Sequence, residues 1–81
     1  MADDERQLTL YTLMADIPAG ETRSYGELAR AIGANPRWVA RQVGQLPHDT
    51  RLPWFRMIRS DGRIADHPGA AEQRERLRLE G

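Results

Sequence analysis

Two arginines and two very small residues recur at helical spacing in the first half of the stretch from Asn35 to Arg56, a combination suited to close contact with a polyanion. Arg37 and Arg41 are four residues apart, the spacing that places two side chains on one face of a helix. Ala40 and Gly44 share this spacing and leave little side chain between the backbone and a partner. Guanidinium groups bind phosphate, and a single arginine can also fill the gap that an extruded nucleotide leaves in a base stack. Arg41 is the candidate for such insertion, and the alternative is a surface arginine that pairs with phosphate.

An aromatic pair behind a proline closes this stretch, in the order Pro53, Trp54, Phe55 and Arg56. The proline restricts the backbone, and the polar residue after the pair favours a fixed, partly exposed corner. Trp54 therefore has two interpretations: a core residue that buries a large area, or a pocket wall that stacks on an extruded base. Tyr25 also has two, because its hydroxyl could reach a phosphate or could cap the edge of the core.

The remaining polar residues predict no enzyme active site, no metal site and no cofactor. The chain has no cysteine, which excludes disulfides, thiolate ligands and cysteine nucleophiles. His48 and His67 are nineteen residues apart, and neither has a second ligand at helical spacing. No serine has a histidine base at a spacing typical of a nucleophile, and no glycine-rich phosphate loop is present.

Charge is unevenly distributed along the chain, although the net charge is zero. All twelve basic residues are arginines; eight of them lie in residues 23–63 against three acids, giving +5 there and −5 in the two flanks together. A basic centre between acidic ends favours local binding of nucleic acid. Chance clustering on a solvated surface is the alternative.

A helix-turn-helix over about residues 24–46 would position these side chains. Ser24 and Glu27 match a capping box at the start of its first helix, and Gly33 suits the end of that helix. Asn35 and Pro36 then suit the cap and first turn of the second helix, which in this motif is the one that reads DNA. The residues expected to face the core are Leu28, Ala29, Ile32, Val39, Val43 and Leu46.

The rest of the chain predicts a mostly α fold with a small β-hairpin, a winged helix-turn-helix-like domain formed by residues 1–81. A helix over 3–16 is expected to bury Leu10, Leu13, Met14 and Ile17. Strands at 55–59 and 63–65 would pair across a turn at 60–62, and a charged helix over 70–79 would cover the core with Leu77, Ala71 and the stem of Arg74. Eighty-one residues without a signal peptide or a membrane-length apolar run indicate one small cytoplasmic domain, which we expect to be monomeric and free of membrane contacts.

Four motifs in register also resemble the alkyltransferase-like proteins, relatives of the O6-alkylguanine-DNA alkyltransferases. These motifs are Ser24-Tyr25-Gly26-Glu27-Leu28-Ala29, Ala40-Arg41-Gln42-Val43-Gly44, Leu52-Pro53-Trp54-Phe55-Arg56-Met57-Ile58 and Asp61-Gly62-Arg63-Ile64. The active enzymes of the family carry a proline-cysteine-histidine-arginine motif whose cysteine accepts the alkyl group. Trp54 stands in place of that cysteine and Phe55 in place of the histidine. The resemblance therefore implies a protein that binds O6-alkylguanine in duplex DNA without repairing it.

The resemblance also implies roles for individual residues. Arg41 falls on the arginine finger of the family, Tyr25 on the tyrosine that rotates the 3′ phosphate, and Trp54 on the wall of the alkyl pocket. The reading helix would enter the minor groove, the base would be flipped out, and the lesion would pass to nucleotide excision repair proteins. Phosphate contacts are expected from Ser24, Tyr25, Arg37 and Arg56.

Three departures from the family pattern accompany the match. The segment from Arg41 to Trp54 is about one helical turn shorter than usual, His67 stands where some relatives carry an arginine beside the lesion base, and a further C-terminal strand is missing after Gly81. Two other functions stay open: a general winged-helix module that binds all duplexes equally, and an interaction domain whose pocket accepts a side chain of a partner protein.

Overall fold

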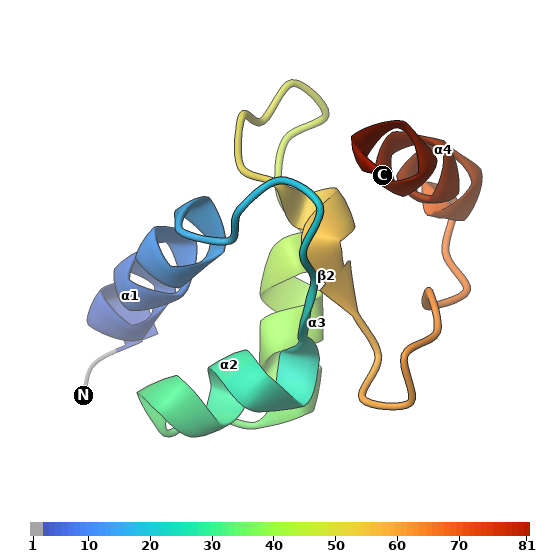
Figure 1. The fold of residues 1–81 in the computed structure, drawn as a ribbon. Coiled ribbons are helices and arrows are strands. Elements are labelled where there is room, and N and C mark those ends of the chain that lie inside the picture. Colours follow the sequence, from blue (N-terminus) through green and yellow to red (C-terminus); the bar gives the residue numbers. More distant parts are fainter. Residues whose placement is uncertain (1–2) are drawn as a thin grey trace.

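A computed structural model describes residues 3–81, and four helices flank a pair of very short strands in it (Figure 1). Its elements, in chain order, are α1 (Asp3–Ala15), β1 (Arg23–Ser24), α2 (Tyr25–Ile32), α3 (Pro36–Gly44), the 3-10 turn η1 (Trp54–Arg56), β2 (Met57–Ile58) and α4 (Ala70–Glu80). Helices α1 and α4 lie on opposite sides of the strands, with α2 and α3 packed against each other between them (Figure 1). Within residues 3–81, no helix has the length and apolarity needed to cross a membrane.

The helix-turn-helix is confirmed, together with the local contacts that were predicted to bound it. The Ser24 hydroxyl accepts a hydrogen bond from the backbone N–H of Glu27 (3.0 Å), and the Glu27 carboxylate accepts one from the N–H of Ser24 (3.1 Å). Gly33 ends α2 in the left-handed conformation, with φ of 69°, a region that glycine enters without a Cβ clash. The Asn35 side chain then accepts from the N–H of Arg37 (2.7 Å) and starts α3.

Eight apolar residues form the buried core, and seven of them, all except Met57, were expected there. They are Leu10, Met14, Ile17, Leu28, Ala29, Ile32, Val39 and Met57. Leu13, Val43 and Leu46, also expected in the core, are only half-buried and pack against its edge. Trp38 packs there too, as a residue of α3 that supports the helix from the core side.

The predicted β-hairpin is wrong, although a two-stranded sheet is present. β2 pairs in parallel with β1, in the register Arg23 to Met57 and Ser24 to Ile58, and the first half of the expected strand is the turn η1. The turn at 60–62 does form, and the N–H of Arg59 donates across it to the carbonyl of Arg63 (2.9 Å). Within residues 3–81, no strand follows it. A parallel pair needs a long crossover, here α2 and α3, and sequence alternation carries no information about such a distant partner.

The core contact of α4 also differs from the prediction. Ala71 and Arg74 are exposed and Leu77 is half-buried, whereas Gln73 is 1% exposed. Its amide nitrogen donates to the carbonyl oxygens of Phe55 (3.1 Å) and Met57 (2.7 Å). A buried amide is tolerated where its hydrogen bonds are satisfied, so a polar residue attaches α4 to η1 and β2.

Candidate nucleic-acid interface

A cavity of about 580 Å³ opens between α3, η1 and the start of α4. This volume is within the range of about 300–1,000 Å³ that small-molecule pockets occupy. Its lining consists of Tyr25, Ala40, Val43, Gly44, Leu46, Pro47, His48, Thr50, Trp54, Ala65, His67, Pro68, Gly69, Glu72 and Gln73. Most of these side chains are apolar or aromatic, so the cavity suits a flat and largely apolar group.

Trp54 forms one wall of the cavity because a tight turn precedes it. Pro53 has φ of −77° and ψ of 62°, and the N–H of Trp54 donates to the carbonyl of Leu52 (2.8 Å). This geometry is an inverse γ-turn, in which the proline ring fixes φ. The Trp54 ring meets Phe55 edge to face, with centroids 5.9 Å apart, and the guanidinium of Arg76 lies 5.8 Å from the Trp54 ring centroid. Trp54 is half-buried, so it supports the core edge and lines the cavity as well.

Tyr25 lines the cavity from the first turn of α2. Its hydroxyl has no hydrogen-bond partner among residues 3–81. Burial raises the pKa of the Tyr25 phenol above its ordinary value, because loss of solvent disfavours the charged form. The hydroxyl therefore remains protonated at neutral pH and available as a donor to a phosphate oxygen.

Helix α3 presents small residues to the cavity and arginines beside it. Ala40 and Gly44 line the cavity, and a Cβ added to Gly44 would meet no atom within 4 Å. Arg37 and Arg41 are exposed and lie outside the lining. The helix thus offers a surface with little side chain next to a cavity opening, flanked by long cations.

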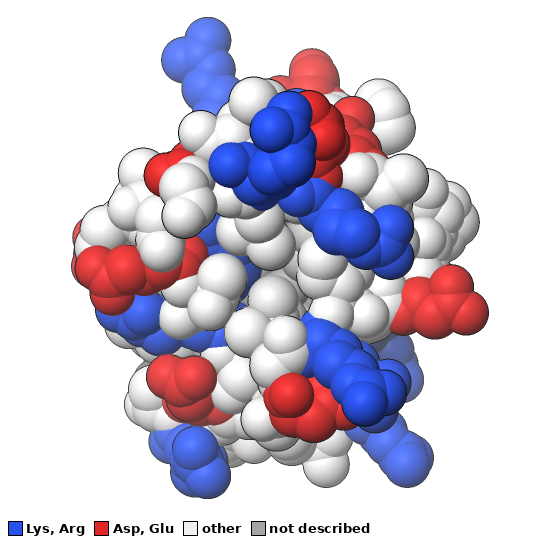
Figure 2. Space-filling view, turned by 45° about the vertical axis from the view of Figure 1, so that its right-hand side comes forward, with Lys and Arg blue, Asp and Glu red and all other residues white. Residues whose placement is uncertain are grey.

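Ion pairs within the chain occupy only some of the arginines of the basic centre. Arg23 pairs with Glu21, Arg56 with Glu80 and Arg59 with Asp61. The other five arginines of residues 23–63 have no acid partner in the described part of the chain: Arg30, Arg37, Arg41, Arg51 and Arg63. On the face shown in Figure 2, cations and anions are interspersed around uncharged groups at the centre. The unpaired arginines of α3 are therefore a better guide to contacts with a polyanion than the net charge of +5 over residues 23–63.

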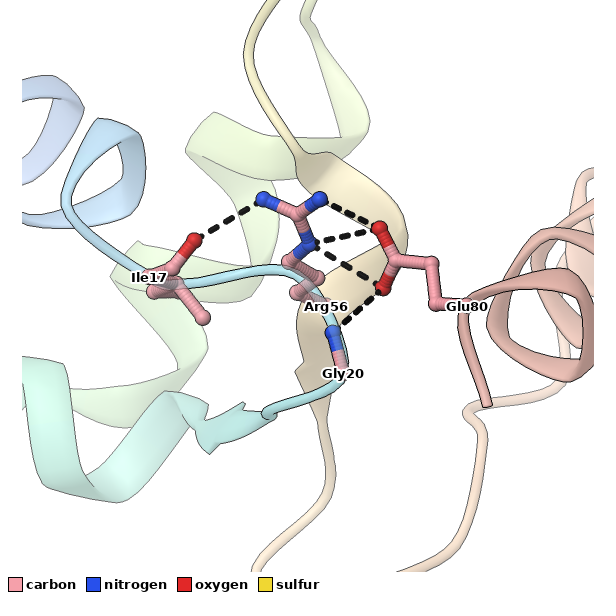
Figure 3. A network of polar contacts seen from close by, with 4 residues as sticks. All are labelled: Ile17, Gly20, Arg56 and Glu80. Carbon is pink, nitrogen blue, oxygen red and sulfur yellow. Dashed lines mark hydrogen bonds and ion pairs between the residues drawn. The ribbon is translucent and has the colours of Figure 1, made fainter.

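Arg56 serves the fold and is not free to contact phosphate. Its guanidinium forms a two-atom ion pair with the Glu80 carboxylate and donates to the carbonyl of Ile17 (2.8 Å), and its side chain is 16% exposed (Figure 3). The same carboxylate accepts from the N–H of Gly20 (3.2 Å). Because Arg56 is held on two sides, we exclude it from the DNA contacts proposed below.

The predicted site residues fall into three groups in space. Tyr25, Trp54 and His67 share the cavity, and Arg37 and Arg41 flank it on α3. Ser24, Pro53 and Arg56 lie outside the lining and hold the local structure. Ser24 is buried at 8% exposure with its oxygen engaged in the α2 cap, so we exclude it as a phosphate contact too.

Several lining residues were missed by sequence reasoning, namely His48, Thr50, Ala65, Glu72 and Gln73. The loop after α3 carried no chemical signal beyond its turn residues. A buried position of α4 was expected to be apolar, so Gln73 was not considered. Among residues 3–81, no cluster of three metal-ligating side chains occurs.

Comparison with known proteins places the chain in a family. Residues 5–81 match the family model described as the DNA-binding domain of 6-O-methylguanine DNA methyltransferase. The chain belongs to this family, and within it to the alkyltransferase-like members. It is similar to alkyltransferase-like protein 1 of Schizosaccharomyces pombe, with 42% identity over 99% of the chain and 77% of the relative. It is also similar to a DNA base-flipping protein of Vibrio parahaemolyticus, with 33% identity over 96% of the chain and 81% of the relative.

Solved structures give the same relationship in three dimensions. The chain is similar to S. pombe Atl1 in complex with damaged DNA containing O6-carboxymethylguanine, with a TM-score of 0.94, 35% identity, and coverage of 100% of this chain and 80% of that one. It is similar to Mycobacterium tuberculosis OGT in complex with DNA, with a TM-score of 0.82, 35% identity, and coverage of 99% of this chain and 50% of that one. The mostly helical fold is thus that of the Atl1 and OGT DNA-binding domains.

Proposed function

We propose that the chain binds O6-alkylguanine in duplex DNA, enters the minor groove with α3, and holds the flipped base in the cavity beside Trp54 without chemical reaction. The observation that carries this proposal is the cavity itself, because its Trp54 wall lies next to the small residues of α3. Two similarities support it: one relative is named a DNA base-flipping protein, and another was solved in complex with damaged DNA.

Energetic balance supports a flipped base. Extrusion of a nucleotide costs a few kcal/mol, and less for a base whose pairing is already weakened by an alkyl group. Stacking on an aromatic side chain returns about 1–3 kcal/mol per base. Trp54 would provide that stacking, and Arg41 would fill the gap in the duplex. Phosphate contacts from Arg37 and Tyr25 would add the salt-dependent part of the affinity.

The absence of an acceptor supports binding without repair. The alkyl acceptor of the active enzymes is a cysteine, and the chain has none. We propose that Trp54 occupies its position, and an indole ring does not act as a thiolate nucleophile. Transfer of the bound lesion to nucleotide excision repair completes the proposal. Protection of cells against alkylating agents is then expected to disappear when nucleotide excision repair is disabled.

The test is a binding titration with two duplexes that differ by one O6-methylguanine, each measured at two salt concentrations. Tighter binding of the lesion duplex is expected, with both affinities falling as salt rises. Equal affinity for both duplexes would reassign the chain as a general winged-helix module. No binding to either, or no salt dependence, would favour an interaction domain, and a mass increase after incubation would reveal alkyl transfer.

A further inference from the structure

The imidazole of His67 is held at both of its nitrogen atoms. The N–H of Gly69 donates to Nδ1 (3.0 Å), and Nε2 lies 2.8 Å from the Gln73 side-chain oxygen. The nitrogen of the Gln73 amide already donates to two backbone carbonyls, so its oxygen is the atom that faces the ring. Nε2 therefore carries the hydrogen and donates it to Gln73, which fixes the tautomer.

The same ring packs against the cavity wall at Trp54. The His67 and Trp54 rings meet edge to face, with centroids 6.2 Å apart and planes at 80°. A Cβ at Gly69 would lie 3.0 Å from His67 Cε1 and 3.5 Å from Trp54 Cη2, so a larger residue would displace the imidazole. We call Gln73, His67 and Gly69 the His67 clamp.

This arrangement leaves the imidazole without a donor or an acceptor for a base in the cavity. A group whose hydrogen bonds are all made can contribute only shape and packing to a ligand. The contact of His67 with Trp54 is thus the route by which it can affect a bound base.

We infer that Gln73 is a positioning residue for lesion recognition, which acts by holding His67 against Trp54. The flipped base is selected by its fit and stacking against a fixed Trp54, and not by a hydrogen bond from His67. This inference rests on the proposed function, and it adds a buried residue of α4 to the recognition machinery.

The first experiment compares Gln73→Met with Gln42→Met. Both substitutions remove one side-chain amide that joins separate elements. Gln42 of α3 accepts a hydrogen bond from Gln7 of α1 (2.7 Å), but unlike Gln73 it does not line the cavity. The ratio of affinities for O6-methylguanine and undamaged duplexes is measured below the melting temperature of each variant. Gln73→Met is expected to lower the ratio about fivefold or more, the size of a typical coupling between neighbouring residues. Gln42→Met is expected to leave it unchanged.

A double-mutant cycle separates positioning from general stabilisation. If Gln73 acts through His67, His67→Ala lowers the ratio to a similar extent, and the double variant loses no more than either single one. In NMR spectra, the Gly69 amide is expected to exchange faster with solvent in Gln73→Met, because the imidazole no longer stays in place to accept from it. Losses that multiply in the double variant, or an unchanged Gly69 amide, would overturn the inference.

A second variant covers the case in which Gln73→Met does not fold. Gly69→Ala keeps the backbone donor and every side chain of the clamp, and it is expected to lower the ratio by moving the ring. An unchanged ratio in that variant contradicts the inference. If the unaltered chain binds both duplexes equally, the proposed function is wrong. If the unaltered chain prefers the lesion and the clamp variants keep that preference, only the inference about Gln73 is wrong.

Discussion

Arg41 and Arg56 are both arginines of the basic centre, but their surroundings give them different uses. Arg41 is exposed on α3 and has no acid partner among residues 3–81, whereas Arg56 is joined to Glu80. The motif around each residue was visible in the sequence. The sequence did not show whether each guanidinium is free, because the partner of Arg56, Glu80, lies twenty-four residues away from it.

Substitution of Arg41 and of Trp54 is expected to have different effects on selectivity. Arg41→Ala should weaken binding to lesion and undamaged duplexes alike, because it removes the contact with the duplex that we propose for Arg41. Trp54→Ala should mainly reduce the difference between them, by up to about 1–3 kcal/mol of lost stacking. Fluorescence titration of labelled duplexes measures both.

Arg74→Ala is the matched control for this pair, because Arg74 is exposed on α4 and outside the cavity lining. It removes the same charge as Arg41→Ala does, and it is expected to change the affinity for neither duplex strongly. An equal loss on both duplexes for Trp54→Ala would refute the assignment of Trp54 as the pocket wall.

At the scale of elements, α3 combines a well-defined start with a bare surface. The Asn35 cap and Pro36 were readable because they contact only the first turn. The parallel pairing of β1 with β2 was not readable, since the strands have two residues each and are separated by two helices. Local signals therefore located the helices, and only long-range contacts defined the sheet.

Gly44 and Gly33 offer a test in which the same methyl group has opposite consequences. Gly44→Ala should leave stability equal or raise it by about 0.5–1 kcal/mol, because alanine favours helix and the site is open. It should weaken DNA binding, because the methyl group lies on the face that we propose approaches the duplex. Gly33→Ala should lower stability by about 1–2 kcal/mol, since φ is 69° there.

Urea denaturation and duplex titration of the two variants measure both quantities. For Gly33→Ala, the affinity of the folded fraction is expected to stay near that of the unaltered chain. Unchanged DNA binding in Gly44→Ala would contradict the close approach of α3.

At the scale of the whole molecule, one ion pair joins the ends of the fold. Arg56 links η1 to the last residue of α4 and to the chain just after α1, and Gly20 completes the network (Figure 3). The pKa of the Glu80 carboxyl is held below its ordinary value, chiefly by the hydrogen bond from Arg56 and further by the Gly20 N–H. The interaction therefore stabilises the fold when Glu80 is ionised.

The sign of the pH dependence follows from that lowered pKa. The stabilisation is fully present above the pKa of a glutamate in the unfolded chain, about 4.3, and it is lost as the pH falls through the lower pKa of folded Glu80. Glu80→Gln is expected to lower the melting temperature at pH 7 and to differ little from the unaltered chain at strongly acidic pH. Thermal unfolding followed by circular dichroism over this range measures it.

Glu75→Gln provides the control on the same helix. Its partner Arg78 also lowers the pKa of Glu75, but the side chains of this pair are 56% and 68% exposed, against 14% and 16% for Glu80 and Arg56. Exposed pairs contribute little to stability, so Glu75→Gln should hardly change the melting temperature. Equal effects of the two substitutions would show that the Glu80 network does not hold the fold together.

The sequence by itself determined the helices, the caps of α2 and α3, and the rigid corner before Trp54. These features depend on contacts between residues at most four apart, so the local order of residues contains them. It also placed Tyr25, Trp54 and His67 in one site, through a resemblance to a family and not through geometry. Tertiary structure alone decided that Glu80 holds Arg56, which strand pairs with β2, and that Gln73 is buried in the lining of the cavity. These outcomes depend on residues sixteen or more positions apart, which meet only when the helices pack and bury their apolar faces.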